Sequence, residues 1–568
     1  MDENIKNAFV AGVERVAAWA DLLDAINVYP VADGDTGRNL SVSLFPLRRA
    51  GEEKDVLVRQ LLMAARGNSG NIACQFFSAF YTLPNARHLK EAVQEGNARA
   101  WKAVSRPKLG TMLSVFDALE EILGDGDFVP NQENVVEIMS HLEQAVHETY
   151  DTLPKLKEAG VVDAGALGMY IFFEGFFYRL AGLPDVYRPV TDVFKERLKI
   201  SSGFHETAES GYCVDFVVKA DSSSADLMKI AGGEESAIVI QEGDFYKVHL
   251  HTDDREKIKA QMSALGSVLN WEDDNLTAQI TQFSNAQASS GLHLMTDAAG
   301  SLTRDDAKRY GFTLLNSYLN VGDKSLPETY FHPDELYSAM RAGVRVSTSQ
   351  ASVFERHQFY SSVLARFEKV LYICVGSVFT GNYSVVLDWK KEHDPENRLA
   401  VIDSGAASGR LGTIVLATQQ YLNHTKDMGK TIAFAKQAVA RCEEYVFLEK
   451  LQYLAAGGRL SKGSAFFGDM LKMKPVISPQ PEGAKKVAVV RNRKDQISLA
   501  EEKLAQSLSP ESRALIMLEY SDNAALVAEF RDRIRGLYPK AVILMQPLSL
   551  TSGAHMGPGT WGVAFLKI

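Results

Sequence analysis

The chain has 568 residues, of which 46% are hydrophobic and 23% charged, the balance of an ordinary folded protein. This length exceeds what one hydrophobic core supports, so two to four domains are expected. The 71 acidic and 61 basic residues give a formal charge of −10. Because no basic excess exists to replace the counterions of phosphates, a nucleic-acid partner is not expected.

The other global features favour a cytoplasmic protein. The first 26 residues are charged and amphipathic, and they lack the apolar core of a secretory signal peptide. No uninterrupted apolar run is long enough to cross a bilayer, so at most peripheral membrane contact is expected. The 4 cysteines lie far apart and form no disulfide framework, which favours a reducing compartment. The composition leaves a homodimer open.

Helical patterns dominate the first third of the chain. Apolar residues recur at helical spacing, between glycine-rich breaks, in segments 9–26, 56–65, 110–123 and 135–153. Short β-branched and aromatic segments follow at 212–218, 236–241 and 246–252. These patterns predict a helical domain over residues 1–195 and a small α/β domain over residues 205–283.

From residue 292 onward, expected strands alternate with helices. The strands are expected at 292–296, 370–375, 400–403, 514–519 and 541–544. Residues 284–291 are small and polar, as in a linker. The alternation predicts a third domain over residues 291–568, with a mostly parallel sheet and ligand groups at the carboxyl ends of its strands.

Two aspartates flank a glycine at a break between expected helices. Asp33 and Asp35, with Asn27 a few residues before them, offer the oxygen ligands that Mg²⁺ takes beside substrate phosphates. The alternative is an ordinary turn, because Asp-Gly-Asp is common in loops.

A second break is rich in glycine and reads Arg66-Gly67-Asn68-Ser69-Gly70. A glycine-rich turn that opens a helix presents backbone N–H groups to an anion. The segment lacks the Walker pattern, so it would be a different phosphate cradle. The alternative is a tight turn between two helices.

Together with segments 106–113 and 160–168, these motifs resemble the ATP-binding domain of the dihydroxyacetone kinase L-subunit family, in the version found in bacterial fatty acid kinases. The resemblance implies an all-α barrel with a nucleotide and two Mg²⁺ ions at one end. It implies that Asp33 and Asp35 hold Mg²⁺ with help from Asn27. Arg38 departs from the family pattern, which usually has threonine there, and Ala166 stands for a glycine. The residues implied to lie near the nucleotide are Arg66, Gly67, Asn68, Ser69, Gly70, Gly110, Thr111, Met112 and Asp163.

The middle segment contains two histidines at strand spacing. His249 and His251 are two residues apart, so on a strand they share a face. With the Cys213 thiolate from another strand they could form a three-ligand Zn²⁺ site. The alternative is a buried core cysteine beside hydrogen-bonded histidines. The segments around these residues resemble the middle domain of fatty acid kinase catalytic subunits, in which the corresponding side chains bind zinc.

Seven short segments in residues 291–568 resemble, in order, the DegV family, which binds fatty acids. The resemblance implies that Thr348, Ser349 and Thr380 bind the carboxylate of the fatty acid, and that Arg459 and His555 lie near this head group. Hydroxyl groups suit this task, because they hydrogen-bond a carboxylate without neutralising it. We expect Thr348 and Thr380 to emerge at one carboxyl-terminal edge of the parallel sheet. The alternatives are a helix cap for the serine and threonine run and a simple turn for the segment of Arg459.

The predicted fold class is therefore multidomain: an all-α barrel, a small α/β middle domain and an α/β DegV-like half of two lobes. The predicted function is an ATP-dependent fatty acid kinase that makes an acyl phosphate for a downstream acceptor enzyme. A carboxylate is already ionised at pH 7 and needs no general base. Asp33 and Asp35 would act through Mg²⁺, and Arg459 or His555 would assist. A small-polyol kinase of the dihydroxyacetone type and a non-catalytic lipid-binding regulator are the alternatives.

Overall fold

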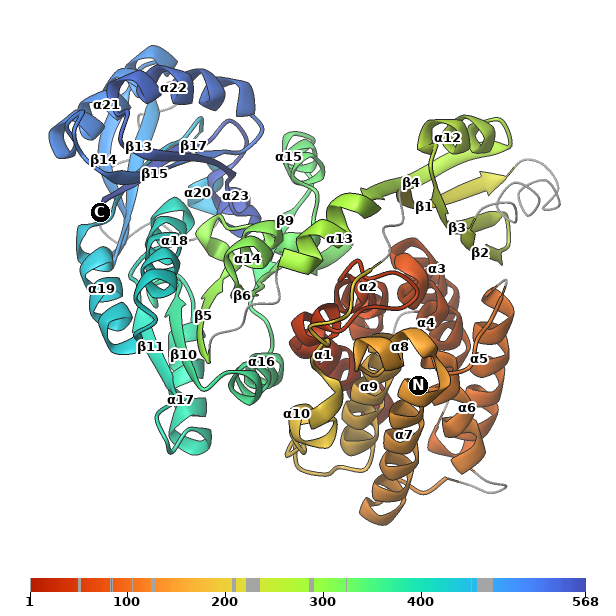
Figure 1. Cartoon of the computed structure of the whole chain (residues 1–568). Coiled ribbons are helices and arrows are strands. Elements are labelled where there is room, and N and C mark those ends of the chain that lie inside the picture. Colours follow the sequence, from red (N-terminus) through yellow and green to blue (C-terminus); the bar gives the residue numbers. More distant parts are fainter. Residues whose placement is uncertain are drawn as a thin grey trace. The chain divides into compact units, whose positions relative to one another are not determined.

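The computed structural model describes residues 2–49, 53–81, 83, 85–104, 106–123, 128–206, 211–220, 235–285, 291–322, 324–450, 452–456 and 473–568. The chain divides into two compact units, Met1–Ala288 and Ser289–Ile568 (Figure 1). Within the described ranges, none of the helices has both the length and the apolar character needed to cross a membrane.

The first part of the first unit is helical, as predicted (Figure 1). Helix α9 is buried and apolar on nearly all sides and packs along α1, as expected of a helix at the centre of a bundle. Two glycines permit this close packing: a Cβ at Gly175 would lie 2.9 Å from the Ala11 carbonyl oxygen, and one at Gly12 would lie 2.8 Å from the Phe172 ring. The helices are α1 (Glu3–Ala25), α2 (Thr36–Leu44), α3 (Lys54–Ala64), α4 (Gly67–Phe80), α5 (Leu89–Ala103), α6 (Met112–Ile122), α7 (Gln132–Thr152), α8 (Pro154–Ala159), α9 (Ala164–Leu180) and α10 (Val190–Val193).

A four-stranded antiparallel sheet follows in the same unit, in the order β2-β3-β1-β4. Its elements are β1 (Tyr212–Ala220), β2 (Glu235–Glu242), β3 (Phe245–Thr252), α12 (Arg255–Ser263), β4 (Gly266–Asn275) and α13 (Leu276–Asn285). Alternate residues of β1 and β3, such as Val214 and Val248, pack with Ile258 of α12. The residues between them point to the opposite face of the sheet. That face carries Cys213, His249 and His251, all of which are buried.

The second unit begins with a fully parallel sheet in the order β11-β10-β5-β6. Its strands are β5 (Leu292–Asp297), β6 (Phe312–Leu315), β10 (Lys369–Cys374) and β11 (Leu399–Asp403). A small antiparallel sheet has the order β8-β7-β9, with β7 (Tyr318–Val321), β8 (Lys324–Pro327) and β9 (Val346–Ser349). The helices of this region are α14 (Arg304–Tyr310), α15 (Pro333–Arg341), α16 (Val353–Arg366), α17 (Asn382–His393), α18 (Ser408–Thr425) and α19 (Met428–Arg441).

The second lobe contains a six-stranded sheet in the order β14-β13-β12-β17-β15-β16. Helices α21 and α22 cover one face of this sheet, and α18 packs between it and the parallel sheet (Figure 1). The elements are β12 (Glu443–Phe447), α20 (Gln452–Ala456), β13 (Lys474–Gln480), β14 (Gly483–Val490), α21 (Arg493–Ser507), β15 (Ala514–Tyr520), α22 (Ala524–Leu537), β16 (Val542–Pro547), α23 (Leu550–Met556) and β17 (Trp561–Lys567).

The predicted fold class, a helical domain followed by α/β domains, is confirmed. The prediction of a mostly parallel sheet holds for the first lobe only. In the second lobe, β15 and β16 run parallel, whereas the other described pairs are antiparallel. The alternation of helices and strands along the sequence does not distinguish a parallel from a mixed sheet. Strand β17, at the end of the chain, lies between β12 and β15 and runs antiparallel to both.

Candidate active site

A pocket in the first unit gathers side chains from the helical bundle and from the four-stranded sheet. The loop between α1 and α2 supplies one wall, the first turn of α4 the second, and strands β1 and β3 the third. The residues that line it are Asn27, Tyr29, Pro30, Val31, Asp33, Asp35, Thr36, Gly67, Asn68, Ser69, Cys213, His249 and His251. The predicted magnesium and zinc residues therefore lie around one pocket.

The wall from the α1–α2 loop is a chain of hydrogen bonds. The Asn27 side chain donates to Asp33 and accepts from the Thr36 hydroxyl at 2.7 Å. The Thr36 and Ser69 hydroxyl oxygens are 3.2 Å apart, which joins this wall to α4. Asp35 is only 8% exposed and immediately precedes α2. The two carboxylates and the Asn27 amide are a donor set that fits Mg²⁺, with Asn27 also fixing the orientation of Asp33.

Gly34 separates the two aspartates and has a φ of +65°. This left-handed conformation is costly for a residue with a Cβ atom. Gly37 in the first turn of α2 faces α1 so closely that a Cβ would lie 2.1 Å from the Ala20 carbonyl oxygen. The glycines of this motif therefore serve backbone geometry, and they place Asp33 and Asp35 at the start of α2.

The wall from the sheet is the candidate zinc site. In the antiparallel register Cys213 pairs with His251, and Asp215 pairs with His249. The ligand atoms of Cys213, His249 and His251 all lie within 4.8 Å of one another. His249 donates from Nδ1 to Asp215 over 3.0 Å, and its buried Nε2 has no hydrogen-bond partner in the described part of the chain. Two imidazoles and a thiol at this spacing fit a three-ligand zinc site.

Charges around this site act on Cys213 and Asp215 in opposite directions. Burial and the neighbouring carboxylates of Asp215, Asp35 and Asp33 raise the pKa of the Cys213 thiol well above its usual value. Burial also raises the pKa of Asp215, but Lys247, His249 and the hydrogen bonds outweigh it, and the net pKa is lowered. Asp215 is thus an ionised carboxylate in a buried place, with the Lys247 ammonium 3.3 Å from its Oδ1.

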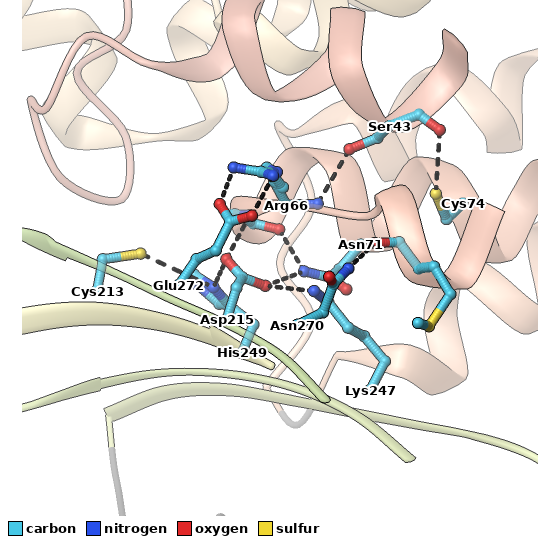
Figure 2. Close-up of polar contacts among 12 residues, drawn as sticks. Ser43, Arg66, Asn71, Cys74, Cys213, Asp215, Lys247, His249, Asn270 and Glu272 are labelled. Atoms are coloured by element: carbon cyan, nitrogen blue, oxygen red, sulfur yellow. Dashed lines mark hydrogen bonds and ion pairs between the residues drawn. The ribbon is translucent and has the colours of Figure 1, made fainter. Parts of the chain in front are cut away.

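The first turn of α4 forms the third wall. Gly67 has a φ of +58° and lines the pocket with Asn68 and Ser69. The other two members of the predicted glycine segment lie elsewhere. Arg66 directs its guanidinium to Glu272 of β4 (Figure 2), and Gly70 packs so tightly that a Cβ would lie 2.1 Å from the Ser43 hydroxyl oxygen.

The remaining predicted nucleotide residues lie where α6 and α9 begin. Gly110 and Thr111 precede α6, with Thr111 as its N-cap, and Met112 is buried beside Gly165. Asp163 caps α9, and burial raises its pKa to about 7 although its hydrogen bonds to backbone N–H groups lower it. Of the residues that the structure describes, these four do not line the pocket of Asp33 and Asp35.

Arg38, which replaces the usual threonine of the family pattern, belongs to α2. Its backbone N–H donates to Asp24 at 3.1 Å. Its guanidinium is 3.9 Å from the Asp274 carboxylate of β4. The arginine side chain is therefore directed toward the sheet.

A cavity of about 150 Å³ lies in the second unit. Two polar pairs belong to its lining: Thr348 of β9 is 3.0 Å from Nε2 of His555 in α23, and the Gln350 amide donates to Thr380 at 2.7 Å. Ser349 also lines the cavity. The apolar lining includes Val375, Phe379, Leu454, Ile477, Ala484 and Met556. An apolar cavity with hydroxyls and an imidazole suits an amphipathic carboxylic acid.

Three protein-family models match the chain in succession. Residues 30–178 match the DAK2 domain, residues 209–283 match the FakA-like middle domain of fatty acid kinases, and residues 291–567 match the DegV family of uncharacterised proteins. The chain carries a DAK2 domain, a FakA-like middle domain and a DegV domain. This order of domains confirms the predicted resemblance.

Two of the curated relatives similar to the chain come from staphylococci and are described as uncharacterised proteins. The chain is 31% identical to one from Staphylococcus epidermidis over 302 residues, which is 48% of this chain and 54% of the relative. It is 29% identical to one from Staphylococcus saprophyticus over 320 residues, or 51% of this chain and 57% of the relative. The chain therefore spans about half the length of the curated relatives that it matches.

Solved structures similar to the chain include DegV proteins. A fatty-acid-binding DegV protein from Thermus thermophilus is 23% identical, and the match covers 49% of this chain and 99% of that protein with a TM-score of 0.45. DegV from Bacillus subtilis, also described as a fatty-acid-binding protein, is 18% identical over 49% of this chain and all of that protein, with a TM-score of 0.46.

For the DegV domain, the predicted position of Thr348 was wrong, and Arg459 cannot be placed. Thr348 does not follow a strand of the parallel sheet; it belongs to β9, which pairs antiparallel with β7. Thr380, by contrast, follows β10 of the parallel sheet, before α17. The two hydroxyls reach the same cavity from different sheets. Arg459 lies outside the described residues.

Sequence reasoning missed two residues at the candidate sites. Asp215 of the middle domain contacts both His249 and α4, and Gln350 of the DegV domain holds Thr380. The signal for Asp215 was present, because a residue two positions after Cys213 on a strand shares its face. Gln350 directly follows the serine and threonine run, but no spacing rule indicates that its amide reaches a residue 30 positions away.

Proposed function

We propose that this chain is an ATP-dependent fatty acid kinase that forms an acyl phosphate from a fatty acid held by its own DegV domain. The observation that carries the proposal is that one chain contains both a carboxylate- and glycine-lined pocket in its DAK2 and middle domains and an apolar cavity with hydroxyls in its DegV domain. The first suits a nucleotide with its metal ions, and the second suits a carboxylic acid.

In this proposal the DAK2 domain binds Mg²⁺ and ATP. Asp33, Asp35 and Asn27 would hold Mg²⁺, and the ion would supply positive charge for the transferring phosphoryl group. The backbone and side chains of Gly67, Asn68 and Ser69 form the pocket wall beside the phosphates. A further set of residues extends the nucleotide site from the bundle: Arg66, Gly70, Gly110, Thr111, Met112 and Asp163.

The middle domain contributes the candidate zinc ligands Cys213, His249 and His251. A zinc ion there would be a second positive centre in the pocket that contains Asp33 and Asp35. The donor set supports zinc, because a thiol and two imidazoles offer ligand atoms within 4.8 Å of one another, and Nε2 of His249 is buried without a hydrogen-bond partner among the described residues. The protein's own contribution is to hold these groups in a fixed arrangement.

In the DegV domain, Thr348, Ser349 and Thr380 bind the fatty acid carboxylate, and His555 assists beside Thr348. We propose Arg459 as a further head-group residue.

A carboxylate oxygen attacks the γ-phosphorus of ATP, the bond from that phosphorus to the β,γ-bridging oxygen breaks, and ADP leaves with the electron pair. Because the acceptor is already ionised, catalysis depends on in-line positioning and charge neutralisation. The acyl phosphate then passes to an acceptor enzyme. In this proposal the protein works in the cytoplasm, where ATP is supplied.

The test is whether ATP turnover by the purified full-length chain depends on fatty acid. The chain, stripped of lipid and supplied with Mg²⁺ and Zn²⁺, is expected to release ADP when oleate is added and to release little without it. Turnover with dihydroxyacetone in place of oleate would instead indicate a small-polyol kinase. ATP turnover with neither substrate, alongside fatty acid retained in the cavity, would indicate a lipid-binding regulator.

A further inference from the structure

Asp215 of β1 is a buried carboxylate that joins the middle domain to the DAK2 domain. Within the described residues, four donors contact it: the Gly67 backbone N–H at 2.9 Å, the Asn71 amide at 3.1 Å, His249 Nδ1 at 3.0 Å and Lys247 Nζ at 3.3 Å. Gly67 and Asn71 belong to the first turns of α4, and the other two belong to β3. Figure 2 draws the contacts of Asp215 with Asn71, Lys247 and His249 as dashed lines.

The two carboxylate oxygens are shared in a crossed pattern. Oδ1 contacts Asn71 and Lys247, and Oδ2 contacts Gly67 and His249. Each oxygen therefore links one group of α4 to one group of β3. Hydrogen bonds to an ionised acceptor are short and strong, and more so in a buried place. A movement of β3 relative to Asp215 would be transmitted to the start of α4.

The two sides of this link reach two different candidate binding sites, one for the metal ion and one for the nucleotide. On the sheet side, Nδ1 of His249 lies 3.0 Å from Oδ2 of Asp215 and 3.9 Å from the Cys213 sulfur. The contact with the carboxylate therefore holds the imidazole in its orientation beside the other two candidate ligands. On the helix side, Gly67 begins the turn whose Asn68 and Ser69 line the pocket. One carboxylate thus fixes both a metal ligand and the nucleotide turn.

We infer that Asp215 is a positioning residue that couples occupancy of the Cys213–His249–His251 metal site to ATP binding at the first turn of α4. The inference rests on the proposed function for the assignment of ATP to this pocket. Coupling of this kind is reciprocal: zinc strengthens ATP binding by the same factor by which ATP strengthens zinc binding. Typical coupling factors are roughly 5 to 150.

The experiment measures the ATP dissociation constant of the full-length chain by calorimetry, with Mg²⁺ present, once as the chelator-stripped protein and once with one equivalent of Zn²⁺. The wild type is expected to bind ATP about 5-fold or more tightly with zinc. In Asp215→Asn the ratio of the two constants should fall toward one, and Asp215→Glu should restore part of it. The matched control is Asn270→Gly, which removes the bond from the Asn270 amide to the Met63 carbonyl oxygen between the same two domains without touching His249, and its ratio should stay that of the wild type.

Asp215→Asn leaves the buried Lys247 ammonium without its counter-charge, which can prevent folding. A second variant keeps the test decisive in that case. Asn71→Ala removes the bonds from the Asn71 amide to Asp215 and to the Gly67 carbonyl oxygen. It leaves the Gly67 N–H, Lys247 and His249 on the carboxylate. The variant should retain zinc, measured by competition with a chromogenic chelator, while its zinc-dependent gain in ATP affinity falls below that of the wild type because the link to α4 is weakened.

The outcomes separate this inference from the proposed function. An unchanged ratio in Asp215→Asn or in Asn71→Ala would overturn the coupling role, even if fatty acid turnover is normal. Wild-type protein that couples zinc to ATP but never turns over ATP with fatty acid would support the coupling and overturn the proposed function. Wild-type protein that binds no ATP in either state would overturn both.

Discussion

Asp33 and Asp35 are the side chains on which phosphoryl transfer depends most directly in the proposed function. Replacing either with alanine removes an oxygen ligand from the proposed Mg²⁺ site. We predict a fall in fatty-acid-dependent ATP turnover of roughly a hundredfold or more, because a metal-bound phosphoryl group loses several kcal/mol of charge stabilisation. Fatty acid retained by the DegV domain, measured by mass spectrometry of the extracted ligand, should be unchanged.

The matched control for these variants is Asp55→Asn, which changes an exposed aspartate in the first turn of α3. It should turn over ATP at close to the wild-type rate. Near-normal turnover in Asp33→Ala or Asp35→Ala would remove these residues from the metal site.

Glu328 gives a prediction about stability and pH in the DegV domain. Its carboxyl is buried and accepts from the Thr551 backbone N–H at 3.1 Å and hydroxyl at 2.9 Å. Burial raises its pKa from 4.5 to about 7, although the Thr551 hydrogen bonds lower it. The folded state therefore holds this proton more tightly than the unfolded state. The resulting stabilisation is complete below pH 4.5 and is lost as the pH rises through about 7.

The measurement compares urea unfolding of the wild type and Glu328→Gln between pH 5 and pH 8. Because glutamine does not titrate, the wild type should lose on the order of 3 kcal/mol relative to the variant as the pH rises over the whole range of the shift. The control is Glu396→Gln at an exposed turn position, which should show no such trend. A difference between wild type and Glu328→Gln that stays constant with pH would contradict the assignment.

Strands β1 and β3 place the candidate zinc ligands, and their geometry follows from the sequence to an unusual degree. The spacing of His249 and His251 indicates a shared face, and the observed register puts Cys213 opposite His251. We predict that the purified full-length chain carries about one equivalent of zinc, as a three-ligand site implies. His249→Ala should lose it, whereas His332→Ala, which changes an exposed histidine, should retain it. Elemental analysis that finds no transition metal in the wild type would return these residues to a purely structural role.

The strand β9 and the turn before α17 present the hydroxyls of Thr348 and Thr380 to the DegV cavity. A hydrogen bond to a charged acceptor contributes about 1.5–3 kcal/mol. Replacing both threonines with valine should weaken retention of the fatty acid carboxylate by roughly one to several factors of ten. Fatty-acid-dependent turnover should fall far more than ATP affinity.

The control for the valine variants is Thr425→Val, whose hydroxyl bonds to the Tyr421 carbonyl oxygen at the end of α18. Equal turnover of oleate by the double variant and the wild type would show that the carboxylate is held elsewhere. His555, which is 3.0 Å from Thr348, would then be the next residue to test.

The small sheet that contains β9 shows why some elements escaped prediction. Its residues Val346–Ser349 are mostly polar, and none of the four is buried. Such a segment has no apolar alternation to mark it as a strand, and its pairing with β7 depends on contacts between distant segments. The strands β5 and β10, in contrast, are short apolar runs with buried cores, and the sequence alone predicts them closely.

For the whole molecule, the order of the domains was predictable, because several motifs in a fixed order are specific even when each one is weak. The assembly of one pocket from α2, α4 and the middle-domain sheet was not predictable. The bond from Gly67 to Asp215 joins residues 148 positions apart, and no local pattern encodes that contact. The sequence separated the magnesium and zinc candidates into two sites, whereas the structure places both sets around one pocket.

The central claim is that one chain both holds a fatty acid and phosphorylates it. The most direct measurement incubates the purified full-length chain with ATP, Mg²⁺, Zn²⁺ and oleate, traps acyl phosphate with hydroxylamine, and quantifies the acyl hydroxamate by mass spectrometry. We predict oleoyl hydroxamate in amounts that match the ADP released, with none when ATP or oleate is omitted. ADP release without hydroxamate, or hydroxamate that forms only after a separate kinase is added, would contradict the account.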